Sequence, residues 1–153
     1  VCRLNSVLVV PEGCNMDVGG KVLLEVPDTK AEIVARTICL GGQAINRGTL
    51  VGKAKGVKAH LECHGLMLSE DGYISAIPQL DALTNEAEMS HEAAVGRIAP
   101  EEIEYLMARG LSEEEATATI VRGFLNVNIE GLPESLAKKI QDTLDTFNYV
   151  KGM

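Results

Sequence analysis

The sequence is poor in aromatic residues, which make up 3% of its 153 residues and include no tryptophan. A hydrophobic core must therefore be built from aliphatic side chains. No uncharged apolar run approaches the length of a membrane-spanning helix, which is about 18 residues or more. The N-terminus has neither the basic start nor the apolar stretch of a signal peptide. We therefore expect no membrane insertion.

Positive charge is also scarce: 14 lysine and arginine residues face 22 aspartate and glutamate residues, and the formal net charge is −8. A general nucleic-acid binder or a protein of anionic membranes needs a basic surface, so we expect neither kind of partner. The 153 residues are 46% hydrophobic and 24% charged, which is typical of a soluble globular protein with one domain or two small subdomains. The chain starts with valine rather than methionine, which fits a part of a longer protein.

Cysteine pairs with metal-binding spacing are missing too. The four cysteines are Cys2, Cys14, Cys39 and Cys63, and no two form a CxxC motif. A structural zinc site is therefore not expected. One disulfide pair is compatible with this number. Without a secretion signal, however, we expect reduced thiols and a cytoplasmic protein.

The N-terminal half, from Val1 to Leu80, contains short aliphatic runs separated by turn signals. The runs are 7–10, 22–26, 32–35 and 37–40, and the turns contain Pro11, Gly19, Pro27 and Gly41. Such runs predict strands, and no helical pattern is long enough to connect them as in an ordinary α/β sheet. A sandwich, a barrel and a β-solenoid all fit this pattern. We find no clean sequence repeat that selects the solenoid.

The segment from Pro100 onward predicts helices. Pro100 fits the first position of a helix, and Gly110 is a natural stop. Ser112 to Glu115 has the spacing of a capping box that starts a second helix. A third helix is expected from Pro133, and its apolar face would consist of Leu136, Ile140, Leu144 and Phe147. We therefore divide the chain into a strand region, 1–86, and a junction with helices, 87–153.

A phosphate-binding loop is the first candidate site to exclude. The segment from Gly48 to Ala54 has three residues between its glycines instead of four, and Ala54 lacks the hydroxyl that binds magnesium. A strand and turn punctuated by glycines explains it better. We expect no nucleotide site, so any ATP hydrolysis must come from another chain.

Two dipeptides carry good metal ligands: Cys63-His64 and His91-Glu92. Thiolate and imidazole bind zinc, copper and iron, and cysteine is the usual ligand of iron–sulfur clusters. Adjacent side chains on a strand, however, point to opposite faces, so one metal cannot easily use both. A small buried Cys63 and a hydrogen-bonded structural His91 remain alternatives. The run Ser90-His91-Glu92 also suggests a hydrolase, although the members of a catalytic triad converge in space and are not consecutive.

Several motifs together resemble the C-terminal part of the SufB/SufD family, over residues 35–150. They are SHEAAVGRI at 90–98, YLMARGLSEEEA at 105–116, IVRGF at 120–124, LECHGLML at 61–68 and IPQL at 77–80. They occur in the order and spacing of that family.

The resemblance implies a right-handed parallel β-helix followed by a C-terminal helical subdomain. It implies a scaffold or scaffold partner in iron–sulfur cluster assembly that catalyses no reaction alone. The residues implicated in a transient cluster fall on Cys63, His91 and Glu92, and no stably bound cofactor is expected. The alternative is an adaptor of the same complex that never holds a cluster.

The family resemblance also implies partners. The helical subdomain would dock a SufC-like ATPase, and we place the docking surface at Arg109, Gly110, Leu111, Ser112 and Phe124. A plain turn between helices is the alternative explanation of residues 109–112. The β-helix would pair with a paralogous SufB or SufD chain, or with a second copy in a two-fold homodimer.

The chain departs from the family pattern in three ways. It is much shorter than typical members. His64-Gly65 follows Cys63, where SufB usually has Asp-Ser. A single chain carries both the cysteine typical of SufB and the histidine implicated in SufD.

Overall fold

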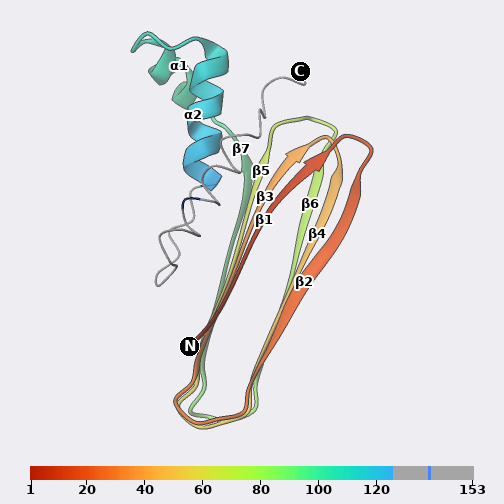
Figure 1. Ribbon diagram of the computed structural model, residues 1–153, viewed down its shortest axis with the longest axis vertical. Coiled ribbons are helices and arrows are strands. Elements are labelled where there is room, and N and C mark those ends of the chain that lie inside the picture. The colour runs from red at the N-terminus through yellow and green to blue at the C-terminus, as the bar shows by residue number, and fades with distance from the viewer. Residues whose placement is uncertain (126–137, 139–153) are drawn as a thin grey trace. The chain divides into compact units, whose positions relative to one another are not determined.

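A computed structural model describes residues 1–125 and Lys138, which form seven β-strands followed by helical segments (Figure 1). The strands are β1 Cys2–Pro11, β2 Asn15–Leu24, β3 Lys30–Leu40, β4 Gln43–Gly52, β5 Lys58–Met67, β6 Tyr73–Ala82 and β7 Glu88–Arg97. The helices are α1 Pro100–Met107 and α2 Glu113–Leu125. The chain divides into two compact units, Val1–Arg97 and Ile98–Met153. The helix expected from Pro133 lies outside the described residues.

The strands of the first unit form two parallel sheets. One sheet has the order β1-β3-β5-β7 and the other the order β2-β4-β6. Figure 1 shows them as two walls, with the chain passing from one wall to the other at every turn. Each strand therefore pairs with the strand that follows it by two in the sequence. This is a parallel β-helix of about three coils, which confirms the expected fold class.

The coils are close to equal in length. Lys30 pairs with Lys58, and Lys58 pairs in turn with Glu88, so the second step is only two residues longer than the first. Asp28 and Gly56 occupy equivalent places in successive turns, and both have a positive φ, 60° and 69°. Aspartate and glycine are among the residues that tolerate this conformation. The turns signalled in the sequence by Pro27-Asp28 and by Gly56 thus mark the ends of coils.

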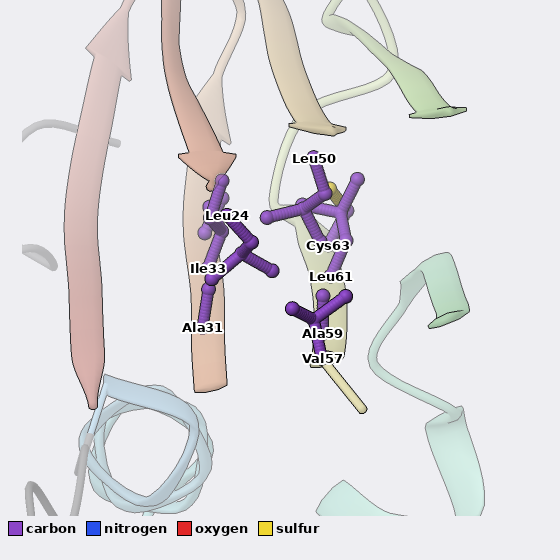
Figure 2. Packing of buried hydrophobic residues seen from close by; sticks show 9 residues of the cluster. Leu24, Ala31, Ile33, Leu50, Val57, Ala59, Leu61 and Cys63 are labelled. Carbon is purple, nitrogen blue, oxygen red and sulfur yellow. The ribbon is translucent and has the colours of Figure 1, made fainter. Parts of the chain in front are cut away.

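An aliphatic core fills the space between the two sheets, as the scarcity of aromatic residues predicted. Figure 2 shows buried side chains from both walls, and the cluster consists of Leu24, Ala31, Ile33, Ala35, Leu50, Val57, Ala59, Leu61 and Cys63. One polar contact joins the sheets inside, where the Asn46 amide nitrogen donates to the Thr37 hydroxyl over 2.8 Å. We call this face of each sheet the inner face and the opposite one the outer face.

Several strands are longer than the sequence pattern indicated, and β2 runs through Gly19, where a turn was expected. β3 is one continuous strand, Lys30–Leu40, although two separate runs were expected there. The interruption at Arg36 is polar without being a turn, because Arg36 takes the outer face while its neighbour Thr37 bonds to Asn46 inside. β7 extends the strands to Arg97, so the units divide at residue 97 rather than at the expected 86. Its residues are largely exposed, which explains their polar sequence.

The helix ends follow the sequence signals closely. Pro100 opens α1, and Gly110 has a φ of 99° in the turn that follows. Ser112 and Glu115 form the expected capping box: the Ser112 amide donates to the Glu115 carboxylate over 2.8 Å, and the Glu115 amide donates to the Ser112 hydroxyl over 3.2 Å. Neither α1 nor α2, the helices of the described part, is long and apolar enough to cross a membrane.

Candidate functional site

Cys63 lies on the inner face of β5. Its register partners are Ala35 on β3 and Ala93 on β7, and its side chain is 3% exposed. Figure 2 shows it beside Leu50 and Leu61 in the hydrophobic cluster. Burial raises the pKa of the Cys63 thiol above its ordinary value of 9.0, and the negative charge of Glu62 raises it further. The thiol is therefore protonated at neutral pH and becomes a ligand only when it loses its proton.

His91 lies on the inner face of β7, two positions out of register with Cys63. It pairs with Leu61, and Cys63 pairs with Ala93. Parallel strands lie about 4.8 Å apart and rise about 3.3 Å per residue, so the Cα atoms of Cys63 and His91 are about 8 Å apart. The His91 Nε2 atom is buried and has no hydrogen-bond partner in the described part of the chain. One chain thus brings the thiol and an unused imidazole nitrogen to the same face of neighbouring strands.

Glu92 lies on the other face of β7. It is exposed, and its register partner is Glu62 on the outer face of β5. The structure therefore brings two of the three candidate cluster residues together, Cys63 and His91, and directs the third away from them. Within residues 1–125 and Lys138, no three His, Cys, Asp or Glu side chains lie close enough to hold a metal ion.

The outer face of β5 carries a half-buried charged cluster. The Glu62 Oε1 atom lies 3.6 Å from a guanidinium nitrogen of Arg36 and 3.1 Å from His64 Nε2. The second contact is within ion-pair distance, but it lacks the geometry of a hydrogen bond, because His64 Nε2 has no hydrogen-bond partner among the described residues. His64 therefore points away from Cys63, as strand geometry predicted for neighbouring residues.

The segment 48–54 is not a phosphate-binding loop. Residues 48–52 are the end of β4, where their backbone groups belong to a strand that pairs with its neighbours. The next residue, Lys53, places its ammonium group 2.6 Å from the Glu25 carboxylate. The strand interpretation is therefore confirmed.

The residues proposed for docking lie in the helical unit. The Arg109 guanidinium stacks 4.7 Å from the centre of the Tyr105 ring, and Gly110 makes the left-handed turn. Ser112 caps α2, and Phe124 lies half-buried near the end of that helix. Local geometry alone explains Gly110 and Ser112, which shape the turn and cap the helix. Arg109 is exposed.

Comparison with known proteins gives the family. Residues 1–124 match the family model described as "SUF system FeS cluster assembly, SufBD core domain". The chain belongs to the SufBD family. An iron–sulfur cluster assembly SufBD family protein of Archaeoglobus fulgidus is 52% identical over 141 residues, which are 92% of this chain and 38% of that protein. Its counterpart in Methanothermobacter thermautotrophicus is 50% identical over 139 residues, 90% of this chain and 33% of that protein.

More distant SufBD relatives also match. One from Staphylococcus aureus is 36% identical over 135 residues, which are 86% of this chain and 29% of that protein. The chain thus spans roughly a third of the length of these curated relatives. The match to the SufBD core begins at residue 1, so it includes residues 1–34, where the sequence motifs were least distinctive.

Sequence reasoning missed the outer-face group of this SufBD chain. His60, Glu62 and His64 alternate with apolar residues along β5, and such alternation places the three polar side chains on one face. The register partner of Glu62, Glu92, lies one coil further along the chain and is reached only through the pairing of β5 with β7. The alternation was readable in the sequence, but the partner was not.

Proposed function

We propose that this chain is the β-helix and helical part of a scaffold, or scaffold partner, for iron–sulfur cluster assembly. The observation that carries the proposal is the position of Cys63 and His91 on one face of neighbouring strands in a SufBD-family chain. The cluster is cargo that passes through the protein. The proposal assigns no catalytic step to the chain alone.

The two side chains differ in what they contribute. A deprotonated Cys63 is a soft ligand suited to iron and sulfide, and the unused His91 nitrogen is a second, weaker ligand. Because burial keeps the thiol protonated, iron binding must release a proton and open the site to iron. Glu92 would act from the other face, as an oxygen ligand for incoming iron or as a proton acceptor. Four free cysteines fit a reducing, cytoplasmic environment.

Anaerobic reconstitution tests the scaffold. Ferrous iron and sulfide are added to the chain, and the thiolate-to-iron absorption band is recorded. We expect the band in the wild type and in Cys2→Ala, which removes an exposed cysteine outside the core, and its loss in Cys63→Ala. An equal band in wild type and Cys63→Ala would contradict the scaffold.

The alternative is an adaptor that never holds a cluster, and the burial of Cys63 at 3% exposure favours it. A thiol enclosed by Leu50, Leu61 and two alanines serves equally well as a small apolar core residue. The adaptor predicts that Cys63→Ala changes neither cluster formation nor partner binding. The reconstitution experiment therefore separates the two functions.

A SufC-type ATPase is the partner that we propose for the helical unit. Arg109, Gly110 and Leu111 lie in the turn between α1 and α2, and Arg109 is exposed there. Titration calorimetry with such an ATPase tests this assignment. We expect Arg109→Glu to weaken binding and Leu83→Lys, at an exposed position in the β-helix unit, to leave it unchanged. Equal affinity of the Arg109 variant would move the docking surface elsewhere.

Pairing through the β-helix is the second proposed interaction, either with a second copy or with a paralogue. β7 is the last strand of its sheet in the described part of the chain, and an unpaired strand edge is a surface on which another chain can pair. Val95 on β7 is 46% exposed, and Leu83, in a turn, is 66% exposed. We expect light scattering to show dimers that Val95→Lys disrupts and Leu83→Lys does not. A strictly monomeric wild type at high concentration would contradict the homodimer.

A further inference from the structure

Three potential metal ligands share the outer face of β5 and β7. Glu62 and Glu92 are register partners, and His64 lies two residues after Glu62 on the same side of β5. Register partners on parallel strands stand about 5 Å apart at the backbone, so both carboxylates and the imidazole can approach one point. This face is opposite to that of Cys63 and His91.

The contact between Glu62 and His64 is short but is not a hydrogen bond. His64 Nε2 lies 3.1 Å from Glu62 Oε1, yet it is buried and makes no hydrogen bond in the described residues. If an ion lay about 2.1 Å from both atoms, the angle at the ion between His64 Nε2 and Glu62 Oε1 would be about 95°. That angle is close to the right angles of an octahedral site.

The charges around this point favour a cation. Glu62 and Glu92 contribute two negative charges, and Arg36 contributes one positive charge 3.6 Å from Glu62 Oε1. The sum over these three groups is one negative charge. Since no three such side chains of the described residues converge as they stand, the site is completed when Glu92 turns toward Glu62. Glu92 is exposed, so its side chain has room to turn.

His60 is excluded from the same point although it shares the face. It lies four residues from His64, which is about 13 Å along a strand, too far for both imidazoles to bind one ion above Glu62. Its Nδ1 atom also lies 2.8 Å from the Ser90 hydroxyl, with which it shares a hydrogen bond. His60 is therefore a matched control: a histidine on the same strand and face with another partner.

We infer that Glu62, His64 and Glu92 form a binding site for a divalent metal ion on the outside of the β-helix. Two carboxylates and one imidazole suit ferrous or manganous ions in octahedral geometry, and no thiolate takes part. The site deepens the proposed function, because it gives incoming iron a place to bind that is separate from Cys63. Only the identification of the ion as iron rests on the proposed function.

Manganous ion is the probe for the test, because it resists oxidation and prefers oxygen and nitrogen donors to thiolates. The full chain is titrated with Mn²⁺, and the loss of the free-ion electron paramagnetic resonance signal gives the affinity. We expect one site per chain. Since loss of an outer-shell partner alone can cost tenfold in affinity, Glu62→Gln, His64→Gln and Glu92→Gln should each weaken binding by about tenfold or more.

The controls carry opposite expectations. His60→Gln and Cys63→Ala should bind Mn²⁺ within about twofold of the wild type. Arg36→Gln should bind more tightly, because it removes a positive charge beside Glu62. Because Glu92 is exposed, Glu92→Gln should fold normally, which circular dichroism checks.

The site would be overturned by no stoichiometric binding by the wild type, or by equal affinity of the wild type and Glu92→Gln. Loss of binding in Cys63→Ala would also overturn it, by placing the ion at the thiol. The proposed function is tested separately, by the thiolate-to-iron absorption band. A chain that binds Mn²⁺ at the outer face but forms no cluster at Cys63 would keep this inference and reject the scaffold.

Discussion

The β-helix unit and the helical unit are specified by contacts of different range. In the β-helix, each strand pairs with a strand one full coil away in the sequence, and buried side chains such as Leu50 and Leu61 meet between the two sheets. In the helical unit, the ends of α1 and α2 are set by Pro100, Gly110 and the Ser112–Glu115 capping box, all within a few residues of the ends that they define. The β-helix unit therefore depends on stacking between coils that are distant in the sequence. In the helical unit, the ends of the helices are defined by residues close to them in the sequence.

This difference predicts where substitutions act. In the β-helix, a change at one inner position should also destabilise the next coil and the opposite sheet. In the helical unit, a change at a cap should affect one helix end. Three substitutions and one pH series probe the two units, from the largest expected effect to the smallest.

Leu61→Ala should have the largest effect, because this side chain is fully buried between the sheets. The lost apolar contacts and the cavity together should lower the free energy of unfolding by about 2–5 kcal/mol. Urea unfolding followed by circular dichroism measures it. Leu83→Ala, at a 66% exposed position, is the control and should change it by less than about 0.5 kcal/mol. Similar losses in both variants would mean that inner stacking does not hold the unit together.

Gly48→Ala tests the contact between the two sheets. A methyl group at Gly48 would come 2.5 Å from a methyl carbon of Leu61, which is too close without movement. Overpacking of this kind should cost about 1–3 kcal/mol. In Gly48→Ala/Leu61→Ala the new methyl enters space that the leucine leaves, so the double variant should lose less than the sum of the singles. Strictly additive losses would contradict the contact.

Ser112→Ala should have a smaller and local effect, the loss of about 1 kcal/mol of helix stability. The alanine cannot accept the Glu115 amide hydrogen bond. Hydrogen exchange of the α2 amides should rise at the first turn and stay unchanged in the β-helix strands. Ser112→Asp should restore protection, because aspartate caps equally well. Increased exchange in β5 would show instead that a cap of the helical unit also stabilises the β-helix.

The pH dependence of stability should show no effect at neutral pH and a growing one in alkali. Burial raises the pKa of the Cys63 thiol in the folded chain, so the folded state retains its proton where the unfolded state loses it. The resulting stabilisation is complete below the ordinary value of 9.0 and declines as pH rises through the higher folded pKa. Urea unfolding at several pH values should show this decline in wild type and not in Cys63→Ala. A parallel decline in both would assign it to other groups.

Much of the fold was readable from local patterns. The aliphatic runs, the turn at Pro27-Asp28 and the capping box predicted strands, coil ends and a helix start that the structure confirms. The continuity of β3 was not readable, because the charged Arg36 resembles a break, and only the folded structure places it on the outer face beside Glu62. The solenoid repeat was also hidden, because successive coils differ in length by up to two residues and share few residue identities.

For the candidate site, sequence supplied the residues and the rule that neighbours on a strand point to opposite faces. That rule alone separates Cys63 from His64, and His91 from Glu92. It does not say which of them meet. A coil one residue longer or shorter between β5 and β7 would exchange the faces of His91 and Glu92 relative to Cys63.

The sequence by itself determined an aliphatic core, strands followed by helices, and the residues able to bind metal, because composition, alternation and caps act locally. Only the tertiary structure decided that Cys63 and His91 share the inner face of the β-helix, and that Glu62, His64 and Glu92 share the outer face. The physical reason is the register: the pairing of Glu62 with Glu92, one coil apart, depends on the turns and strands of that whole coil together.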